Sequence, residues 1–368
     1  MYVYFAPIAM AFLSILVNLV NERRFDLVLL SLIVLYVVTV SGLRYFSDID
    51  YAPYFDLYQN TPNLTDLRLD DIKGLYGEPG YLFFTSLMKS ANAQFVVVTF
   101  IASLISILAK SFVAFKFAKN ASFVVATYLC VSFITIEFIQ LRWAVATGLL
   151  SLAYYSLYIE RRKISVLFFV AAAAFHYFSL LFLVLAFLAR FNGYHRYYVA
   201  IFLAFVFSIA TKLGGVSIFY QANSDIYLIS RFLRYLNDPL SNVGAFSYLK
   251  ILFYVVTVYT LGRLKDCDVD IKTDQRFIFL FRSSFLFLSA AMVVSFVPIF
   301  FFRTMVMADL FSIMLIAYMV TRIRTFAFKM TYVYVITILF STWCYIDVLN
   351  YSNAHRIFQY ETWLKFAL

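Results

Sequence analysis

The sequence contains few charged residues. Aspartate, glutamate, lysine and arginine make up 14% of the 368 residues, whereas soluble domains carry roughly 25%. Hydrophobic residues make up 64%, and several long apolar runs contain no charge. Runs of about 20 apolar residues are typical of transmembrane helices. Strand-like alternation is also absent, and helices satisfy a lipid-facing backbone by themselves. The sequence therefore predicts an all-α polytopic membrane protein.

Cysteine and histidine are also scarce, with three residues of each. Cys130, Cys267 and Cys344 lie far apart, so their spacing indicates neither a disulfide framework nor a metal site. No phosphate-binding glycine loop, zinc spacing or Ser–His–Asp order occurs. We therefore expect no metal ion and no other cofactor.

The formal net charge is +10. In a membrane protein, lysine and arginine accumulate in cytoplasmic loops, which accounts for a basic balance. No basic face with interleaved aromatic residues indicates a nucleic-acid-binding module. We therefore expect no nucleic-acid partner.

Eleven apolar runs predict about eleven spanning helices. They cover about residues 2–20, 25–42, 95–115, 121–139, 143–159, 164–189, 198–212, 247–262, 277–297, 300–320 and 329–348. The basic clusters between the runs fall on one side of the membrane only if 164–189 folds back. Each half of that run would reach roughly 18 Å, short of a bilayer core of about 30 Å. We predict a short or re-entrant hairpin with His176 near its extracytoplasmic tip.

The resulting topology places both termini on the extracytoplasmic side of the membrane. It predicts a single transmembrane domain over 1–368, with outer-face segments at 43–94 and 213–246. Ten polar residues then map to the outer side, where charges near spans usually face a cavity or a partner. They are Arg44, Asp48, Asp50, Glu78, Glu137, Arg142, His176, Arg231, Arg234 and Arg303.

Several of these residues have a structural alternative. Arg142 would snorkel to the interface, and Glu78 before Pro79 would cap a helix. Arg231 and Arg234 share one helix face, which suits either phosphate binding or a solvated amphipathic helix.

Two further patterns leave alternatives open. Arg303 would bind a ligand or pair with Asp309, although a spacing of six residues puts the two on different helix faces. Asp48 and Asp50 resemble a DxD metal motif, which is a weak pattern.

Five segments, in this order along the chain, resemble the EpsG-like family. SGLRYFSDIDYAPYFDLY and GEPGYLFF are similar to the start of its members. IQLRWAVATGLLSLAYY, AAAAFHYFSLLF and FFRTMVMADLFSIML are similar to its later arginine and histidine blocks. The resemblance covers about residues 41–320, and the family is similar to Wzy-type polymerases of O-antigen, capsule and exopolysaccharide. Members commonly carry glycine near the first Asp, whereas Phe46-Ser47 precede Asp48 here.

The resemblance implies a glycosyltransferase in a bundle like that of the GT-C enzymes. A growing glycan would pass from undecaprenyl diphosphate to a lipid-linked oligosaccharide at the outer face of the bacterial inner membrane. It implies that Arg142, Arg231, Arg234 and Arg303 bind the diphosphate. His176 would act on the diphosphate side, and Glu78 or Asp50 would accept the proton of the acceptor hydroxyl. Substrate would also contact Arg44, Asp48, Tyr54, Glu137, Trp143 and Tyr177.

The expected partners are the lipid-linked oligosaccharide and membrane lipid, and a chain-length regulator protein is a candidate partner. Three other functions fit less well. A GT-C glycosyltransferase that transfers one sugar would carry acids and a metal in the first outer loop. An O-antigen ligase would share the donor chemistry. A flippase would carry charges along a path through the whole bilayer, often with an internal repeat.

Overall fold

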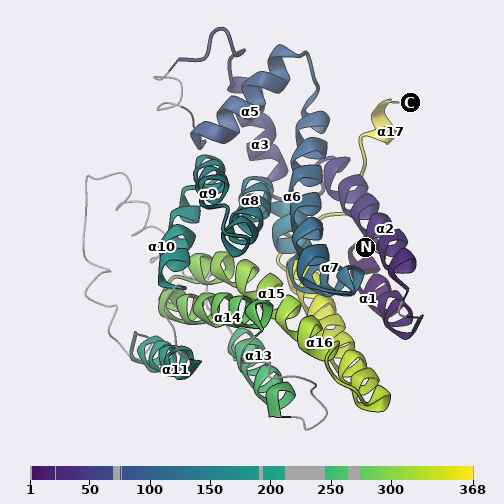
Figure 1. Ribbon diagram of the computed structural model, residues 1–368. Coiled ribbons are helices and arrows are strands. Elements are labelled where there is room, and N and C mark those ends of the chain that lie inside the picture. The colour runs from purple at the N-terminus through teal and green to yellow at the C-terminus, as the bar shows by residue number, and fades with distance from the viewer. Residues whose placement is uncertain are drawn as a thin grey trace. The chain divides into compact units, whose positions relative to one another are not determined.

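The protein is described from a computed structural model (Figure 1). The structure describes residues 2–20, 22–68, 75, 77–189, 194–211, 245–263 and 274–367. All regular elements in these ranges are helical, and two isolated β-bridges occur beside them. Six helices are long and apolar enough to cross a membrane. The prediction of an all-α polytopic membrane protein is confirmed, and the count of eleven spans stays a prediction.

The described chain forms two compact units. Unit 1 contains residues 1–184 and 326–368, and unit 2 contains residues 185–325. The helices of unit 1 are α1 (Tyr2–Val20), α2 (Arg23–Gly42), α3 (Tyr51–Asn60), α5 (Pro79–Ser90), α6 (Phe95–Phe117), α7 (Ala121–Ser132), η1 (Phe133–Ile139), α8 (Leu141–Tyr158), α9 (Arg162–Phe175), η2 (Tyr177–Ser179), α16 (Phe326–Asn353) and α17 (Leu364–Ala367). Helix α10 (Leu180–Leu188) contains the boundary between the units.

The break predicted inside 164–189 is confirmed. Helix α9 ends at Phe175, and His176 has an extended backbone with φ −159° and ψ 114°. The 3₁₀ turn η2 and helix α10 follow it. Helix α9 packs along α8 and contacts α5. The chain leaves α9 at His176.

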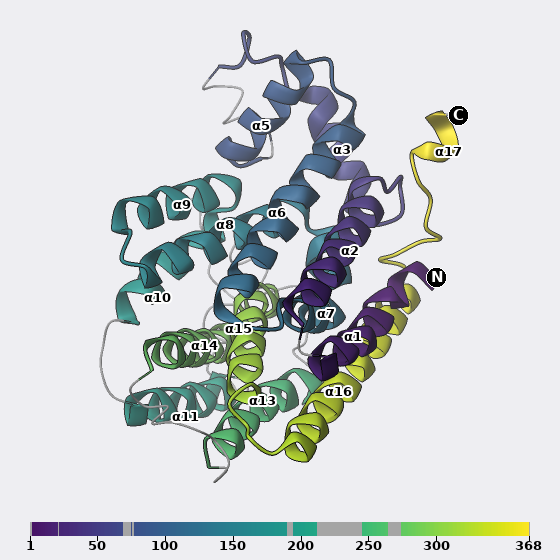
Figure 2. The ribbon, with the colours of Figure 1, turned by 45° about the vertical axis from the view of Figure 1, so that its right-hand side comes forward.

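One end of unit 1, called the loop end here, brings together segments that are far apart in sequence. Tyr36 of α2 donates to the carbonyl of Val3, and Thr99 of α6 donates to the carbonyl of Gly42 at 2.6 Å. Helix α1 lies beside α16, with the rings of Phe5 and Tyr345 stacked (Figure 2). The end of α2, the starts of α1 and α6, and the end of α16 therefore share the loop end.

The opposite end of unit 1, called the basic end here, joins the other helix termini. The carboxylate of Asp26 accepts from the backbone N–H groups of Ala121 and Ser122, which satisfies the first turn of α7. Arg23 lies over the ring of Phe115, and Phe117 packs on Tyr158. Basic residues gather here: Arg23, Arg24, Lys116, Lys119, Arg161, Arg162, Lys163 and Lys329.

Unit 2 is a smaller group of helices, described by itself. It contains α11 (Tyr194–Ala210), α13 (Ala245–Arg263), α14 (Gln275–Val293), η6 (Val294–Phe296) and α15 (Pro298–Val320). Helix α14 packs against α15 and α11, and α13 packs against α15. Pro298 occupies the first turn of α15, where its missing N–H is not needed.

Gly80 permits the closest approach between α5 and α9. A Cβ at Gly80 would lie 2.8 Å from the backbone carbonyl carbon of Ala174, so the helices must separate to admit one. We expect Gly80→Ala to lower the free energy of unfolding by about 1–3 kcal/mol. The measurement is an unfolding titration with SDS of the protein in detergent micelles.

Gly262 provides the matched control, because a Cβ there would meet Met319 at an ordinary 3.8 Å. Gly262→Ala should stabilise the protein by about 0.5–1 kcal/mol through helix propensity alone. Equal effects of the two substitutions would show that the α5–α9 contact is not tight.

Candidate functional site

Arg142 stands at the centre of a buried polar group at the loop end of unit 1. It lies in the first turn of α8, and its guanidinium forms an ion pair with Glu78. Its Cζ lies 5.3 Å from the ring centroid of Tyr54 and 5.8 Å from that of Tyr81. The Arg142 side chain is only 17% exposed. It is therefore held among aromatic rings and does not snorkel.

Glu78 has the backbone position that capping predicts but a different side-chain contact. It is the N-cap residue of α5, and Pro79 takes the first helical turn. Its carboxylate makes no capping hydrogen bond and pairs with Arg142 instead. The close approach at Gly80 brings this end of α5 against α9. The GEPG segment thus places an acid beside the arginine of α8.

Asp48 and Arg44 pair with each other in the loop 43–50. The Nε of Arg44 donates to Asp48 Oδ2 at 2.7 Å, and its Nη1 donates to the carbonyl of Ser41 at 2.5 Å. Asp48 Oδ1 accepts from the backbone N–H of Asp50 at 3.0 Å. Burial raises the pKa of Asp48, and the Arg44 guanidinium opposes that rise. The Asp48 carboxylate is therefore engaged by its neighbours, whereas Asp50 is half-buried at the start of α3.

Phe46 has an unusual backbone conformation in this loop. Its φ is 43°, in the left-handed region that favours glycine. The ring of Phe46 packs on Tyr45, Tyr51 and Phe55. A phenylalanine thus takes the conformation that a glycine would adopt easily, and aromatic contacts stabilise it. Asp48 keeps its place opposite Arg44.

His176 lies beside Trp143 at the break after α9. The two ring centroids are 5.0 Å apart. The His176 Nδ1 accepts from the backbone N–H of Phe178 at 3.3 Å, so the neutral imidazole carries its proton on Nε2. His176 is therefore set up to donate a hydrogen bond from Nε2. Tyr177 follows it and is 47% exposed.

Three donors near these residues are buried without a hydrogen-bond partner among the described residues. They are Nη2 of Arg44, the hydroxyl of Tyr81 and Nε1 of Trp143. Buried polar groups are normally satisfied, so each such donor needs an explanation. A polar substrate or water at the loop end would accept from them.

A charged network lies beneath the first turn of α8. Lys110 of α6 and Glu137 of η1 are completely enclosed, with their charged atoms 2.5 Å apart. Ser106 and Tyr128 also donate to Glu137. Lys110 also donates to the carbonyl of Ala144, two residues after Arg142, and the Ser106 hydroxyl lies 2.8 Å from the same carbonyl oxygen. The network thus supports the turn that carries Arg142, while the predicted substrate contact of Glu137 remains a prediction.

The C-terminal tail, residues 354–367, pairs with the loop 43–50. The backbone N–H of Tyr45 donates to Glu361 at 2.9 Å, and that of Phe358 donates to Ser47 at 2.9 Å. Two antiparallel bridges join Arg44 to Thr362 and Asp48 to Ile357. The Trp363 indole donates to the hydroxyl of Tyr51 at 2.6 Å. The end of the chain therefore holds the loop that contains Arg44 and Asp48.

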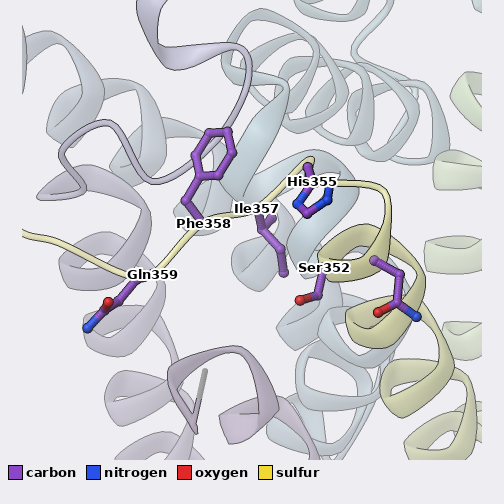
Figure 3. A pocket seen from close by; sticks show the side chains of 6 residues that line it. Ser352, His355, Ile357, Phe358 and Gln359 are labelled. Carbon is purple, nitrogen blue, oxygen red and sulfur yellow. The ribbon is translucent and has the colours of Figure 1, made fainter.

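The same tail borders an open hollow of about 740 Å³ at the end of α16 (Figure 3). Its described lining residues are Ser352, Asn353, His355, Ile357, Phe358 and Gln359. His355 is the histidine of this lining. The structure places it where α16 turns into the tail.

Unit 2 carries the remaining candidate that the structure describes. Arg303 lies in the second turn of α15. Asp309 accepts from Lys250 and Tyr254 of α13, each at 2.8 Å. Asp309 thus pairs across to α13, in agreement with its predicted place on another face from Arg303. Arg231 and Arg234 lie outside the described residues, so their predicted gathering with Arg142 and Arg303 stays a prediction.

Sequence reasoning missed one buried lysine, one half-buried lysine and the tail. Lys110 and Lys250 each stand alone inside an apolar run, and a charge within a span is itself a signal of a buried partner. The tail offers no comparable signal, since its partner lies 314 residues away in the case of Ser47 and Glu361.

The all-helical fold, with six helices long and apolar enough to cross a membrane among the described residues, defines a polytopic membrane protein. The EpsG family model matches residues 27–362, and the chain belongs to this family of Wzy-like polysaccharide polymerases. The resemblance seen in sequence is therefore confirmed. No curated protein and no solved structure is detectably similar to the chain.

We expect Lys110→Met to destabilise the protein by about 3–5 kcal/mol, because Glu137 would remain buried without its opposite charge. The double variant Lys110→Met, Glu137→Gln should recover most of that loss. The measurement is the free energy of unfolding in SDS titrations. Lys116→Met serves as the control, since Lys116 is exposed on the same helix. A double variant no more stable than the single one would show that the two charges do not depend on each other.

We expect removal of residues 355–368 to raise amide exchange in the loop 43–50 by about tenfold or more, because backbone donors of Tyr45 and Ile49 lose their acceptors. Hydrogen exchange with mass spectrometry would measure it, with α6 peptides as the internal reference. Unchanged exchange in the loop would show that the tail does not hold it.

Proposed function

We propose that this protein polymerises a polysaccharide from lipid-linked repeat units at the extracytoplasmic face of the bacterial inner membrane. The donor would be a glycan on undecaprenyl diphosphate, and the acceptor a second lipid-linked oligosaccharide. The observation that carries the proposal is the enclosed arginine, Arg142, with Glu78 and aromatic rings around it at the loop end. Family membership supports the polymerase class.

The distribution of basic residues supports the orientation. Basic side chains gather at the basic end of unit 1, and the Arg142 group lies at the loop end. Lysine and arginine are retained on the cytoplasmic side of membrane proteins. The loop end, with Arg142, His176 and Asp50, would therefore face the cell exterior or periplasm, where the diphosphate headgroup lies.

In the proposed reaction the acceptor hydroxyl oxygen bonds to C1 of the donor sugar. The bond from C1 to the diphosphate oxygen breaks, and its electron pair leaves with the diphosphate. Negative charge grows on that oxygen, so fixed donors aimed at it favour the transition state. Arg142 and the Nε2–H of His176 supply such donors. Arg231, Arg234 and Arg303 are proposed as further diphosphate ligands.

The proton of the acceptor hydroxyl goes to a carboxylate. We assign it to Asp50, on the basis of its place near Tyr54, a proposed sugar contact. Asp50 is half-buried and begins α3, one turn before Tyr54. Glu78 then orients Arg142. Tyr54, Trp143 and Tyr177 are proposed to contact the sugars, and a chain-length regulator protein is a proposed partner.

The test is reconstitution of the purified protein with lipid-linked repeat units extracted from the producing cells. Wild-type protein should convert them into a ladder of products. Asp50→Asn should lower kcat about 10²–10⁴-fold through loss of the base. Asp56→Asn should leave kcat unchanged, because Asp56 is an exposed acid on the same helix.

The outcomes separate the alternatives. A single added sugar instead of a ladder would identify a glycosyltransferase of another kind. Full activity of Asp50→Asn together with loss of activity in Glu78→Gln would show that Glu78 is the base. Arg142→Lys should also reduce kcat strongly, since a lysine cannot reproduce the planar, forked contacts of a guanidinium group.

A further inference from the structure

The hollow at the end of α16 combines the size of a ligand site with neutral polar groups. Its volume of about 740 Å³ falls in the range of small-molecule pockets. Hydroxyl, amide and imidazole groups come from Ser352, Asn353, His355 and Gln359, and Phe358 adds an aromatic ring that is 43% exposed (Figure 3). The described lining contains no acid, lysine or arginine. Such a lining suits a neutral, hydroxyl-rich ligand better than a phosphate or a cation.

His355 is held in a backbone conformation that would suit glycine. Its φ is 51°, in the left-handed region. The backbone N–H groups of His355 and Arg356 donate to Ser352 and Tyr351, so His355 ends α16 at the position where glycine is usual. Residues other than glycine are uncommon in this conformation. Here the imidazole lines the hollow.

The hollow is joined directly to the loop that contains the proposed base. The backbone N–H of Ile49 donates to the carbonyl of Arg356 at 3.3 Å, and Asp48 forms a bridge with Ile357. Asp50 directly follows Ile49 in the chain, so it lies next to this junction. A ligand in the hollow would therefore be held by the segment that positions the loop 43–50.

We infer that this hollow is a saccharide-binding subsite that holds the acceptor repeat unit with a hydroxyl directed toward Asp50. Sugar hydroxyls would exchange hydrogen bonds with the amides, Ser352 and His355, and a sugar face would pack on Phe358. The inference rests on the proposed function, because that function makes the acceptor an oligosaccharide. It adds the place and the residues that recognise it.

His355→Gly is the sharpest test, because glycine suits the backbone at φ 51° and only the imidazole is lost. Glu160→Gly is the matched control: Glu160 has φ 59° and lies between α8 and α9 at the basic end. The probe is the oligosaccharide that mild acid releases from the extracted lipid-linked repeat unit. Its binding to the full chain in detergent is measured by isothermal titration calorimetry.

We expect His355→Gly to weaken binding of this oligosaccharide about five- to tenfold, the loss of one hydrogen bond. The KM for the acceptor should rise by a similar factor with little change in kcat, and Glu160→Gly should change neither. The double variant Asn353→Ala, Gln359→Ala should weaken binding further. Inorganic diphosphate should not compete with the oligosaccharide.

Equal binding by wild type and His355→Gly would overturn the inference, as would no binding to wild type or competition by inorganic diphosphate. These outcomes are separate from the proposed function. A wild-type protein that builds ladders while His355→Gly binds normally would refute only the subsite. A protein that binds the oligosaccharide through His355 but forms no ladder would refute the polymerase.

Discussion

A charge inside an apolar helical bundle is costly unless an opposite charge and hydrogen bonds surround it. Unit 1 meets this constraint with three pairs: Arg44–Asp48, Lys110–Glu137 and Arg142–Glu78. The Arg44–Asp48 pair lies within the loop 43–50, whereas the other two pairs join different helices. The Arg142–Glu78 pair joins the start of α8 to the start of α5. Satisfaction of buried charge therefore fixes the geometry of the loop end.

The ion pairs also depend on glycines, which let helices approach each other closely. Helix α5 reaches Arg142 because Gly80 lets it approach α9 closely. Helices α6 and α8 approach at Gly148, where a Cβ would lie 3.1 Å from Ser106. Ser106 itself donates to Glu137. Small residues thus set the helix distances at which short ion pairs form.

The helices could be predicted from the sequence because the length and composition of a long apolar run indicate a helix. All eleven runs are helical, and the break at His176 followed from the length of its run and the side on which basic residues fall. The place of Asp309 apart from Arg303 followed from helical geometry. Partners across the bundle could not be predicted: nothing near Lys110 in the sequence indicates Glu137, and nothing near Ser47 indicates Glu361.

Only part of the site could be predicted, because contacts between distant segments cannot be read from the sequence. Arg142 and Glu78 were identified because each is a charge beside a span, yet their mutual contact depends on how α5, α8 and α9 pack. Asp48 and Asp50 were indistinguishable in sequence because they are two residues apart. Only the structure shows that Arg44 engages Asp48 and leaves Asp50 at the start of α3.

The pairing of the tail with the loop 43–50 has a consequence for biosynthesis. The ribosome makes the loop early and its partner segment much later, since Glu361 lies 314 positions after Ser47. A chain still being inserted into the membrane therefore has no complete loop end. Helix α16 and the residues 354–367 must be made before this face takes its final form. A truncated product would thus lack a finished binding surface even though its first helices had already folded.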